Sequence, residues 1–322
     1  MYISCHCAPL PSSLYGRYKV FLESRGLRDE EDADAVALMT DDDGEIVACG
    51  ARSGRVIKQL AVSPAAEGEG ACASLLSELI ANAYQAGHTH LFLCTKPQNK
   101  AMFQSVGFFP IAETADALLM ENRRGGIDRF LSSLPHPQGR IGAVVCNCNP
   151  FTLGHLHLIE TAASKCDGLH VFVLSEDLSE FSAQERLELV KLGAAHIPNC
   201  FVHQSEDYLV SRATFPAYFI KDSGRVDSVR ADLDIALFAE RIAPALGISL
   251  RFVGEEPFCP VTRAYNERMK ELLPKHGIEL IEIPRLNDIS ASRVRALMKQ
   301  KDYEAIKSLV PETTYEAILR HS

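Results

Sequence analysis

The stretch Asn147-Cys-Asn-Pro-Phe-Thr-Leu-Gly-His155 lies between an apolar run, Ile141–Cys146, and a segment with helical spacing, Leu156–Lys165. A buried strand, a tight loop and a helix start in this order predict a phosphate-binding site. Gly154 lets the backbone approach a ligand closely. The free N–H groups at the helix start favour an anion. His155 adds a hydrogen-bond donor that can become cationic.

A second element of the same kind occurs late in the chain. Ile289-Ser-Ala-Ser-Arg-Val-Arg295 follows the last predicted strand and opens a helix. Ser290 or Ser292 can cap this helix, and their hydroxyls can also hold a terminal phosphate. Arg293 or Arg295 can neutralise the phosphate charge. The alternative is a plain helix cap with an incidental basic residue, and the sequence leaves open which arginine points inward.

The second half of the chain alternates short apolar strands with helices, which predicts a Rossmann-like parallel sheet with helices on both faces. In such sheets ligands bind beyond the carboxyl ends of the strands, where Thr152 and His155 lie. The predicted strands span residues 142–146, 170–174, 199–203, 249–253 and 279–283. The helix predicted before the fourth strand spans Asp234–Leu246.

The first half predicts a smaller α+β domain. Two strands, Ala35–Met39 and Glu45–Gly50, flank an Asp-Gly pair that is typical of a hairpin. A helix is expected over Ala71–Ala86, directly after the glycines Gly68 and Gly70. Proline and glycine are frequent in the stretch that follows this half, as expected at a boundary. We therefore predict domains over residues 1–121 and 141–322, joined by a linker over 122–140.

Composition narrows the class of protein. A net charge of −9 argues against a nucleic-acid-binding surface. No apolar run approaches the roughly 20 residues that span a bilayer, so no membrane association is expected. The ten cysteines include no Cys-x-x-Cys pair, so neither zinc nor another structural metal is predicted. Free thiols and the absence of a secretory leader predict a cytoplasmic location.

The motifs resemble known families. Thr-x-Gly-His with a late Ile-Ser-x-Ser element resembles the nucleotidyltransferase superfamily. The longer string Asn-x-Asn-Pro-Phe-Thr-Leu-Gly-His is similar to that of the citrate lyase ligase family, and this resemblance covers nearly the whole chain. The first half resembles the GNAT acetyltransferases: Gly68 and Gly70 match their phosphate-binding loop, whereas Ala65 departs from it.

The resemblance to citrate lyase ligases implies a reaction. Acetate attacks ATP, with Mg²⁺ on its phosphates, to give acetyl-AMP and diphosphate. The acetyl group then passes to the thiol of a dephospho-CoA-derived prosthetic group on the acyl-carrier subunit of citrate lyase, and AMP leaves. The product is the acetyl-thioester that activates citrate lyase.

The residues expected to carry this reaction follow from the two motifs and the glycine loop. We expect His155, Thr152 and Arg293 to act in catalysis. We expect Gly68 and Gly70 to hold the CoA-like arm. We expect ATP to be bound by Asn149, Phe151, Gly154, His155, Ser290, Ser292, Arg293, Arg295 and Glu255, with either Glu255 or Glu256 facing the nucleotide.

Other features are open to more than one interpretation. Arg186, beside Glu185 on the second predicted helix of this half, could lie near the phosphates, but it is interpreted instead as one partner of a surface ion pair. Ser175-Glu-Asp177 stands where many superfamily members carry a lysine, and Ser211–Phe219 is interpreted as a lid or acyl-site wall. Two other functions remain open: an adenylyltransferase acting on a mononucleotide or phosphopantetheine-type acceptor, and a non-catalytic or regulatory protein.

Overall fold

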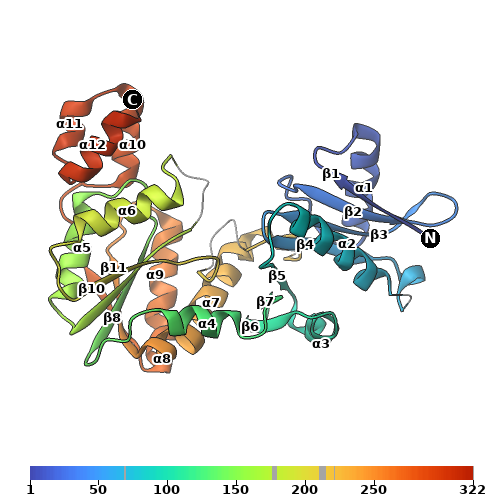
Figure 1. Cartoon of the computed structure of the whole chain (residues 1–322), viewed down its shortest axis with the longest axis horizontal. Coiled ribbons are helices and arrows are strands. Elements are labelled where there is room, and N and C mark those ends of the chain that lie inside the picture. Colours follow the sequence, from blue (N-terminus) through green and yellow to red (C-terminus); the bar gives the residue numbers. More distant parts are fainter. Residues whose placement is uncertain (69, 176–179, 210–214, 221, 322) are drawn as a thin grey trace. The chain divides into compact units, whose positions relative to one another are not determined.

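The computed structural model describes residues 1–68, 70–175, 180–209, 215–220 and 222–321 (Figure 1). The chain forms two compact units. Unit 1 comprises Met1–Gly126 and Thr214–Leu233, and unit 2 comprises Ile127–Ala213 and Asp234–Ser322. A stretch from the later half of the sequence therefore packs with the first half, which the sequence did not predict.

Unit 1 is built on a seven-stranded sheet. Its strands are β1 (Tyr2–Cys7), β2 (Ala35–Thr40), β3 (Ile46–Ser53), β4 (Val56–Val62), β5 (Phe92–Thr95), β6 (Phe109–Glu113) and β7 (Leu118–Glu121). They lie in the order β1-β2-β3-β4-β5-β7-β6, and neighbours are antiparallel except β4 and β5, which run parallel. The predicted hairpin of β2 and β3 is confirmed.

Helices lie on both faces of this sheet, so its central strands are buried on both sides. Along β2, Ala37 and Met39 pack in one core with α2, whereas Val36 and Leu38 pack in another with α1. The period of two residues in a strand sends these side chains to opposite faces. The helical elements are α1 (Ser12–Ser24), η1 (Pro64–Ala66), α2 (Ala71–Gln85), η2 (Pro97–Asn99) and α3 (Lys100–Ser105).

The segment that returns to unit 1 is held by hydrogen bonds to the backbone. The Arg28 guanidinium donates to the carbonyls of Ala217 and Ile220 at 3.2 and 2.8 Å. The Arg28 backbone N–H donates to the Tyr218 carbonyl at 3.0 Å. Further along lie η3 (Ser223–Arg225) and the start of α7 (Val226–Leu237).

Unit 2 contains a five-stranded sheet in which every neighbouring pair is parallel. Its strands are β8 (Ile141–Cys146), β9 (Gly168–Val173), β10 (Cys200–Gln204), β11 (Ile248–Gly254) and β12 (Glu279–Ile283). They lie in the order β10-β9-β8-β11-β12, so the chain reverses direction across the sheet between β8 and β11. A ligand crevice is expected at this reversal.

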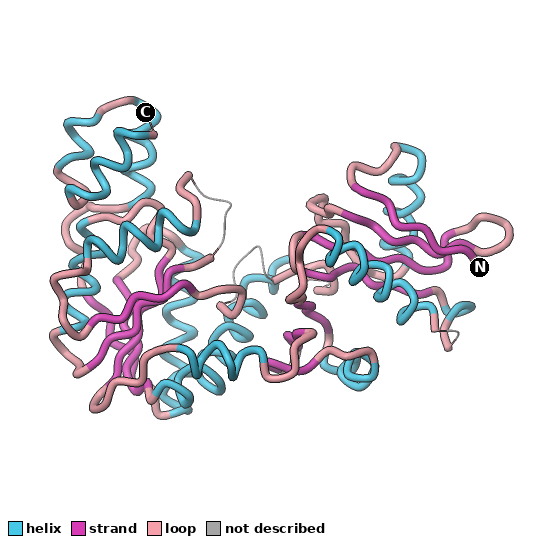
Figure 2. The backbone as a smooth tube through the Cα atoms, viewed as in Figure 1, coloured by secondary structure: helices cyan, strands magenta, loops and turns pink. Residues whose placement is uncertain are grey.

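Helices cover both faces of this sheet, as predicted, and Figure 2 shows its strands in magenta between helices in cyan. The chain carries α4 (Gly126–Ser133), α5 (Leu153–Ala163), α6 (Ala183–Gly193), the end of α7, the π-helical turn η4 (Phe238–Ile242), α8 (Ala243–Leu246), α9 (Pro260–Leu272), η5 (Leu273–His276), α10 (Ala291–Gln300), α11 (Tyr303–Lys307) and α12 (Glu312–Arg320). None of the helices among the described residues combines the length and apolar character needed to cross a bilayer.

The α/β fold class is confirmed, and the predicted strands of unit 2 agree with the structure to within two residues. The helix predicted over Asp234–Leu246 was placed too late, because α7 begins at Val226 and a π-helical turn follows it. β1 was missed because most of its side chains are exposed, so the strand lacks an apolar pattern. The short helices α11 and α12 were also missed.

The core of unit 2 reaches the motif loop through Phe151. This ring is 0% exposed and packs against α6, where Gly193 leaves room for it. A Cβ atom on Gly193 would lie 2.3 Å from Cε1 of Phe151. The small residue on α6 therefore determines where the motif loop can lie.

We predict that Gly193→Val destabilises unit 2, because the new side chain would overlap a ring that the core prevents from moving. Overpacking of this kind costs about 1–3 kcal/mol, which lowers the melting temperature by about 2–4 °C per kcal/mol in a unit of this size. Thermal unfolding followed by circular dichroism measures the change. Gly254→Val is the matched control, since a Cβ there meets no atom within 4 Å. Equal melting temperatures for the two variants would contradict the assigned packing.

Candidate functional site

The two sequence motifs meet at the carboxyl edge of the unit 2 sheet. A Cβ atom on Gly154, in the first turn of α5, would lie 3.3 Å from the carbonyl oxygen of Ile289. Ile289 directly precedes the cap of α10. The Arg295 guanidinium, on α10, donates a hydrogen bond to the carbonyl of Asn149. Gly154 thus permits a close approach between the starts of the two helices.

A capping box fixes the first motif. Thr152 precedes α5, and its hydroxyl accepts a hydrogen bond from the His155 backbone N–H at 3.3 Å. In return, the Thr152 backbone N–H donates to Nδ1 of His155 at 3.1 Å. A backbone N–H can only donate, so Nδ1 is unprotonated and the neutral ring carries its proton on Nε2. This tautomer keeps Nε2–H as a donor for a ligand.

The His155 imidazole is neutral at physiological pH. Burial of the ring and, to a smaller extent, the positive charge of Arg285 lower the pKa of His155 to about 4. Both causes disfavour the protonated form. The expectation that this histidine becomes cationic therefore does not hold for the protein's own environment. His155 acts there as a neutral donor, and positive charge must come from other side chains.

Arg285 is a candidate site residue that sequence reasoning missed, and its charge acts on His155. It follows β12 by two residues, and its guanidinium contacts the Glu256 carboxylate at 3.1 Å. It also lies 5.3 Å from the ring centre of Phe258, which is 68% exposed. Its Nε atom is buried and has no hydrogen-bond partner among the described residues. Its only signal in the sequence was a position two residues after the last strand of a parallel sheet, which has no distinctive spacing.

The second motif forms the predicted cap. Ser290 precedes α10, and its hydroxyl accepts a hydrogen bond from the Arg293 backbone N–H at 3.2 Å. The Ser290 and Ser292 hydroxyls lie 3.0 Å apart. The Arg293 side chain is exposed, whereas Arg295 is half-buried and reaches the first motif loop. Arg295 thus links α10 to the first motif loop, whereas Arg293 faces solvent.

Three other predicted nucleotide-binding residues lie in different surroundings. Phe151 is fully buried and stacks on His155, with ring centres 6.0 Å apart and an interplanar angle of 15°. The Asn149 side-chain oxygen accepts from the backbone N–H of Phe181 at 3.3 Å. Glu255 is exposed, whereas its neighbour Glu256 accepts from Arg285. Of the two glutamates, Glu256 is therefore the one that contacts Arg285.

The interpretation of Arg186 as a surface residue was wrong. Its side chain is 0% exposed and braces the loop after β8. The guanidinium donates to the backbone and side-chain oxygens of Asn147 at 2.8 and 2.6 Å, to the Leu174 carbonyl at 2.8 Å and to the Phe181 carbonyl at 3.2 Å. The predicted surface partner, Glu185, instead caps α6. Of Ser175–Asp177, the stretch that stands where many superfamily members carry a lysine, residues 176 and 177 lie outside the described residues.

Unit 1 contains a pocket of about 540 Å³. Gly68, Gly70 and the first turn of α2 line it. Gly70 caps α2 in a left-handed conformation, with φ +74°, which glycine adopts without strain. Tyr218 and Phe219, from the segment interpreted as a lid or wall, also line this pocket. Residues 211–214 of that segment lie outside the described residues.

The described residues of neither unit bring three His, Cys, Asp or Glu side chains into a metal-binding group. The site at the edge of the unit 2 sheet therefore consists of two helix starts, a neutral imidazole donor and an arginine held by a carboxylate. This combination suits a ligand with several phosphates, because both helix starts and the arginine favour negative charge.

Comparison with solved structures gives only weak global similarity. Escherichia coli ElaA is 20% identical, with a TM-score of 0.33, and the match covers 38% of this chain and 99% of that protein. Thermotoga maritima TmcAL bound with alpha-thio ATP is 16% identical, with a TM-score of 0.35, and the match covers 56% of this chain and 55% of TmcAL.

Comparison with families and curated sequences is more informative. Residues 141–318 match the citrate lyase ligase C-terminal domain, and residues 17–116 match the acetyltransferase (GNAT) domain. The citrate (pro-3S)-lyase ligase of Klebsiella pneumoniae is 45% identical over 93% of this chain and 91% of its own length. Its counterpart in Haemophilus influenzae is 39% identical over 92% of both chains. The chain belongs to the citrate lyase ligase family.

Proposed function

We propose that this protein activates citrate lyase by ATP-dependent acetylation of a thiol. ATP, acetate and the thiol of the prosthetic group on the acyl-carrier subunit are converted to the acetyl-thioester, AMP and diphosphate. The observation that carries the proposal is the contact between the starts of α5 and α10, which brings the two motifs to one edge of the sheet, where we infer that they bind phosphate. The similarity to named citrate lyase ligases supports the choice of substrates.

The first step forms acetyl-AMP. A carboxylate oxygen of acetate attacks the α-phosphorus of ATP, and the bond from that phosphorus to the bridging oxygen of diphosphate breaks. Negative charge gathers on the phosphate oxygens in the transition state, so catalysis depends on positioning and on charge stabilisation. Nε2–H of His155 donates to an oxygen of the α-phosphate. Thr152 and Phe151 act indirectly, since one fixes the ring's tautomer and the other supports its plane.

The remaining phosphates lie at the start of α10. The backbone N–H groups of its first turn and the hydroxyls of Ser290 and Ser292 bind the terminal phosphate, and the exposed Arg293 turns toward it. Arg285 supplies a cation between the two helices once a phosphate replaces Glu256 as its partner. Mg²⁺ carried by the triphosphate would supply further positive charge and would need few protein ligands.

The second step transfers the acetyl group to the thiol. The thiolate attacks the acetyl carbonyl carbon, the bond from that carbon to the phosphate oxygen breaks, and AMP leaves. The pocket of unit 1 holds the CoA-like arm that carries the thiol, with its phosphates at Gly68 and Gly70. The free N–H groups at the start of the 15-residue helix α2 suit this role.

We predict that the protein exchanges labelled diphosphate into ATP when acetate is the only acceptor. Reversal of the first step requires acetate and not the thiol, so exchange isolates the adenylation site. Nicotinamide mononucleotide and phosphopantetheine serve as control acceptors. Exchange that depends on one of these and not on acetate would instead identify an adenylyltransferase. No exchange with any acceptor would favour a non-catalytic protein.

We predict that His155→Ala lowers acetate-dependent exchange by about 10²- to 10³-fold, the usual effect of removing one donor to a developing charge. The KM for ATP should change less, because the donor acts mainly in the transition state. His157→Ala, on the same helix, is the matched control. Because the pKa of His155 is about 4, kcat/KM of the wild type should show no imidazole titration near pH 6.5. Such a titration, removed by the substitution, would contradict the neutral-donor role.

We predict that Gly70→Glu separates the two steps. A carboxylate at the start of α2 should repel the phosphates of the arm, so acetylation of the carrier thiol should fall while acetate-dependent exchange persists. Gly87→Glu is the control, since Gly87 also has a positive φ, +84°, and lies at the far end of α2. Equal loss of both reactions in Gly70→Glu would remove the arm site from the proposal.

A further inference from the structure

The strands β4 and β5 separate inside the sheet of unit 1. They pair at Val56–Phe92 and Ile57–Leu93, although β4 continues to Val62 and β5 to Thr95. At Gln59 the backbone takes a φ of +56°, and the register of β4 against β3 shifts nearby. A bulge of this kind redirects the backbone groups of a strand. The two strands therefore leave backbone donors and acceptors facing a gap.

The conformation of Gln59 is held by its own side chain. Its Nε2 donates to the Arg28 carbonyl at 3.0 Å and to the Asp29 carboxylate at 3.1 Å. Its Oε1 accepts from the Tyr18 hydroxyl at 2.9 Å. A non-glycine residue in the left-handed region persists only when its surroundings over-determine it, and such residues are concentrated at ligand sites. The bulge is thus a fixed feature that presents the Gln59 backbone to the gap.

One hydroxyl fills this gap. The Tyr218 hydroxyl donates to the Cys94 carbonyl on β5 at 3.2 Å, and it receives a hydrogen bond from the Gln59 backbone N–H on β4. Tyr218 is 5% exposed and Cys94 is 0% exposed. A secondary amide offers the same combination, an acceptor oxygen and a donor N–H. Tyr218 therefore satisfies two strand edges that an amide could satisfy equally well.

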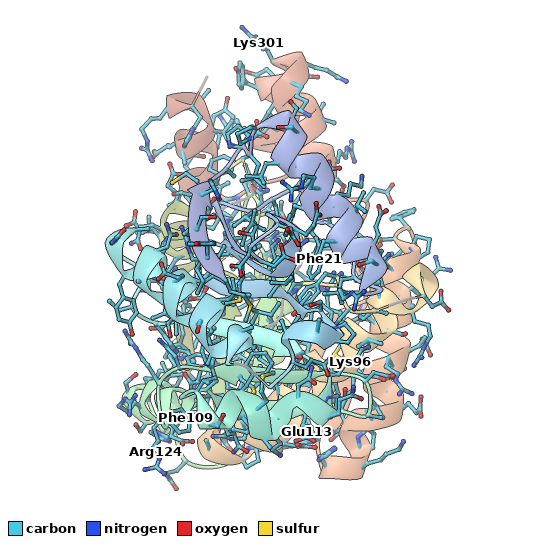
Figure 3. All side chains as sticks on the ribbon, turned by 90° about the vertical axis from the view of Figure 1, so that its right-hand side faces the viewer. Phe21, Lys96, Phe109, Glu113, Arg124 and Lys301 are labelled. Atoms are coloured by element: carbon cyan, nitrogen blue, oxygen red, sulfur yellow. The ribbon has the colours of Figure 1, made fainter. Side chains whose placement is uncertain are left out.

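The gap opens on the pocket that also contains the glycine loop. Tyr218 and Phe219 line this pocket together with Gly68 and Gly70. Lys96, which is labelled in Figure 3, adds a cation after β5. A phosphopantetheine-type arm has matching chemistry, since it joins phosphate to a chain with two secondary amides and a terminal thiol. The volume of such an arm suits this pocket of about 540 Å³.

We propose that Tyr218 is a displaceable substitute for an amide of the arm. The segment Phe215–Ile220 occupies the gap until a phosphopantetheine-type arm pairs with the backbones of Gln59 and Cys94 and releases it. This inference rests on the arm site in the proposed function. In sequence the segment lies within the residues 141–318 that match the citrate lyase ligase C-terminal domain. Arm binding in unit 1 therefore acts on a part of the chain that belongs to the matched catalytic half.

The test is calorimetric binding of dephospho-CoA to the full chain. Tyr218→Phe removes the competing hydroxyl, so the Kd should fall about five- to tenfold, the effect of one hydrogen bond. Tyr84→Phe, on the exposed face of α2, should bind as the wild type does. Hydrogen exchange gives a second readout: dephospho-CoA should raise the exchange of residues 215–220 in the wild type, whereas a ligand that merely packs against them would lower it.

Arg28→Lys is a second variant that loosens the segment without touching the gap, and it should also tighten binding. Thermal unfolding confirms that each variant is folded. Unchanged or weaker binding by folded Tyr218→Phe, or lower exchange of residues 215–220, would show that Tyr218 is a fixed wall and overturn the inference. If dephospho-CoA binds to none of these proteins, the arm site fails as well, and acetate-dependent exchange still tests unit 2 independently.

Discussion

The candidate site depends on the approach of α5 to the backbone that leads into α10. Gly154 makes this approach possible, because any larger residue would press on the Ile289 carbonyl at 3.3 Å from its Cβ. Two helix N-termini are thereby brought to one edge of a parallel sheet, where the positive ends of their dipoles add to each other's effect on an anion. The glycine was expected to admit a ligand, and the structure gives it a role in packing one motif against the other.

In this candidate site the neutral hydrogen-bond donor and the positive charge come from different side chains. The capping box and burial keep His155 neutral with its proton on Nε2, so it contributes a directed donor without a net charge. Positive charge comes from arginines, which stay protonated when partly buried. Arg285 is already balanced by Glu256, and this pairing lowers the cost of keeping a cation beside an apolar core. A polyanionic ligand would then exchange one partner for another.

The sequence was sufficient to predict the parallel sheet of unit 2 and both motifs, because apolar strands and helix starts leave local patterns. It was not sufficient for residues whose role depends on distant partners. Arg186 was misplaced because its acceptors, Asn147, Leu174 and Phe181, are scattered along the chain. Arg285 was overlooked because one arginine after a strand has no distinctive spacing. The exposed strand β1 lacked the alternation by which strands are identified.

The return of residues 215–233 to unit 1 has a consequence for how such a chain can change during evolution. A gene fragment ending at the linker would encode a first domain that lacks one side of its own groove. Tyr218, Phe219 and the carbonyls that satisfy Arg28 would all be missing. The two units therefore do not follow one another along the sequence. Recombination at the apparent boundary would yield no complete unit 1.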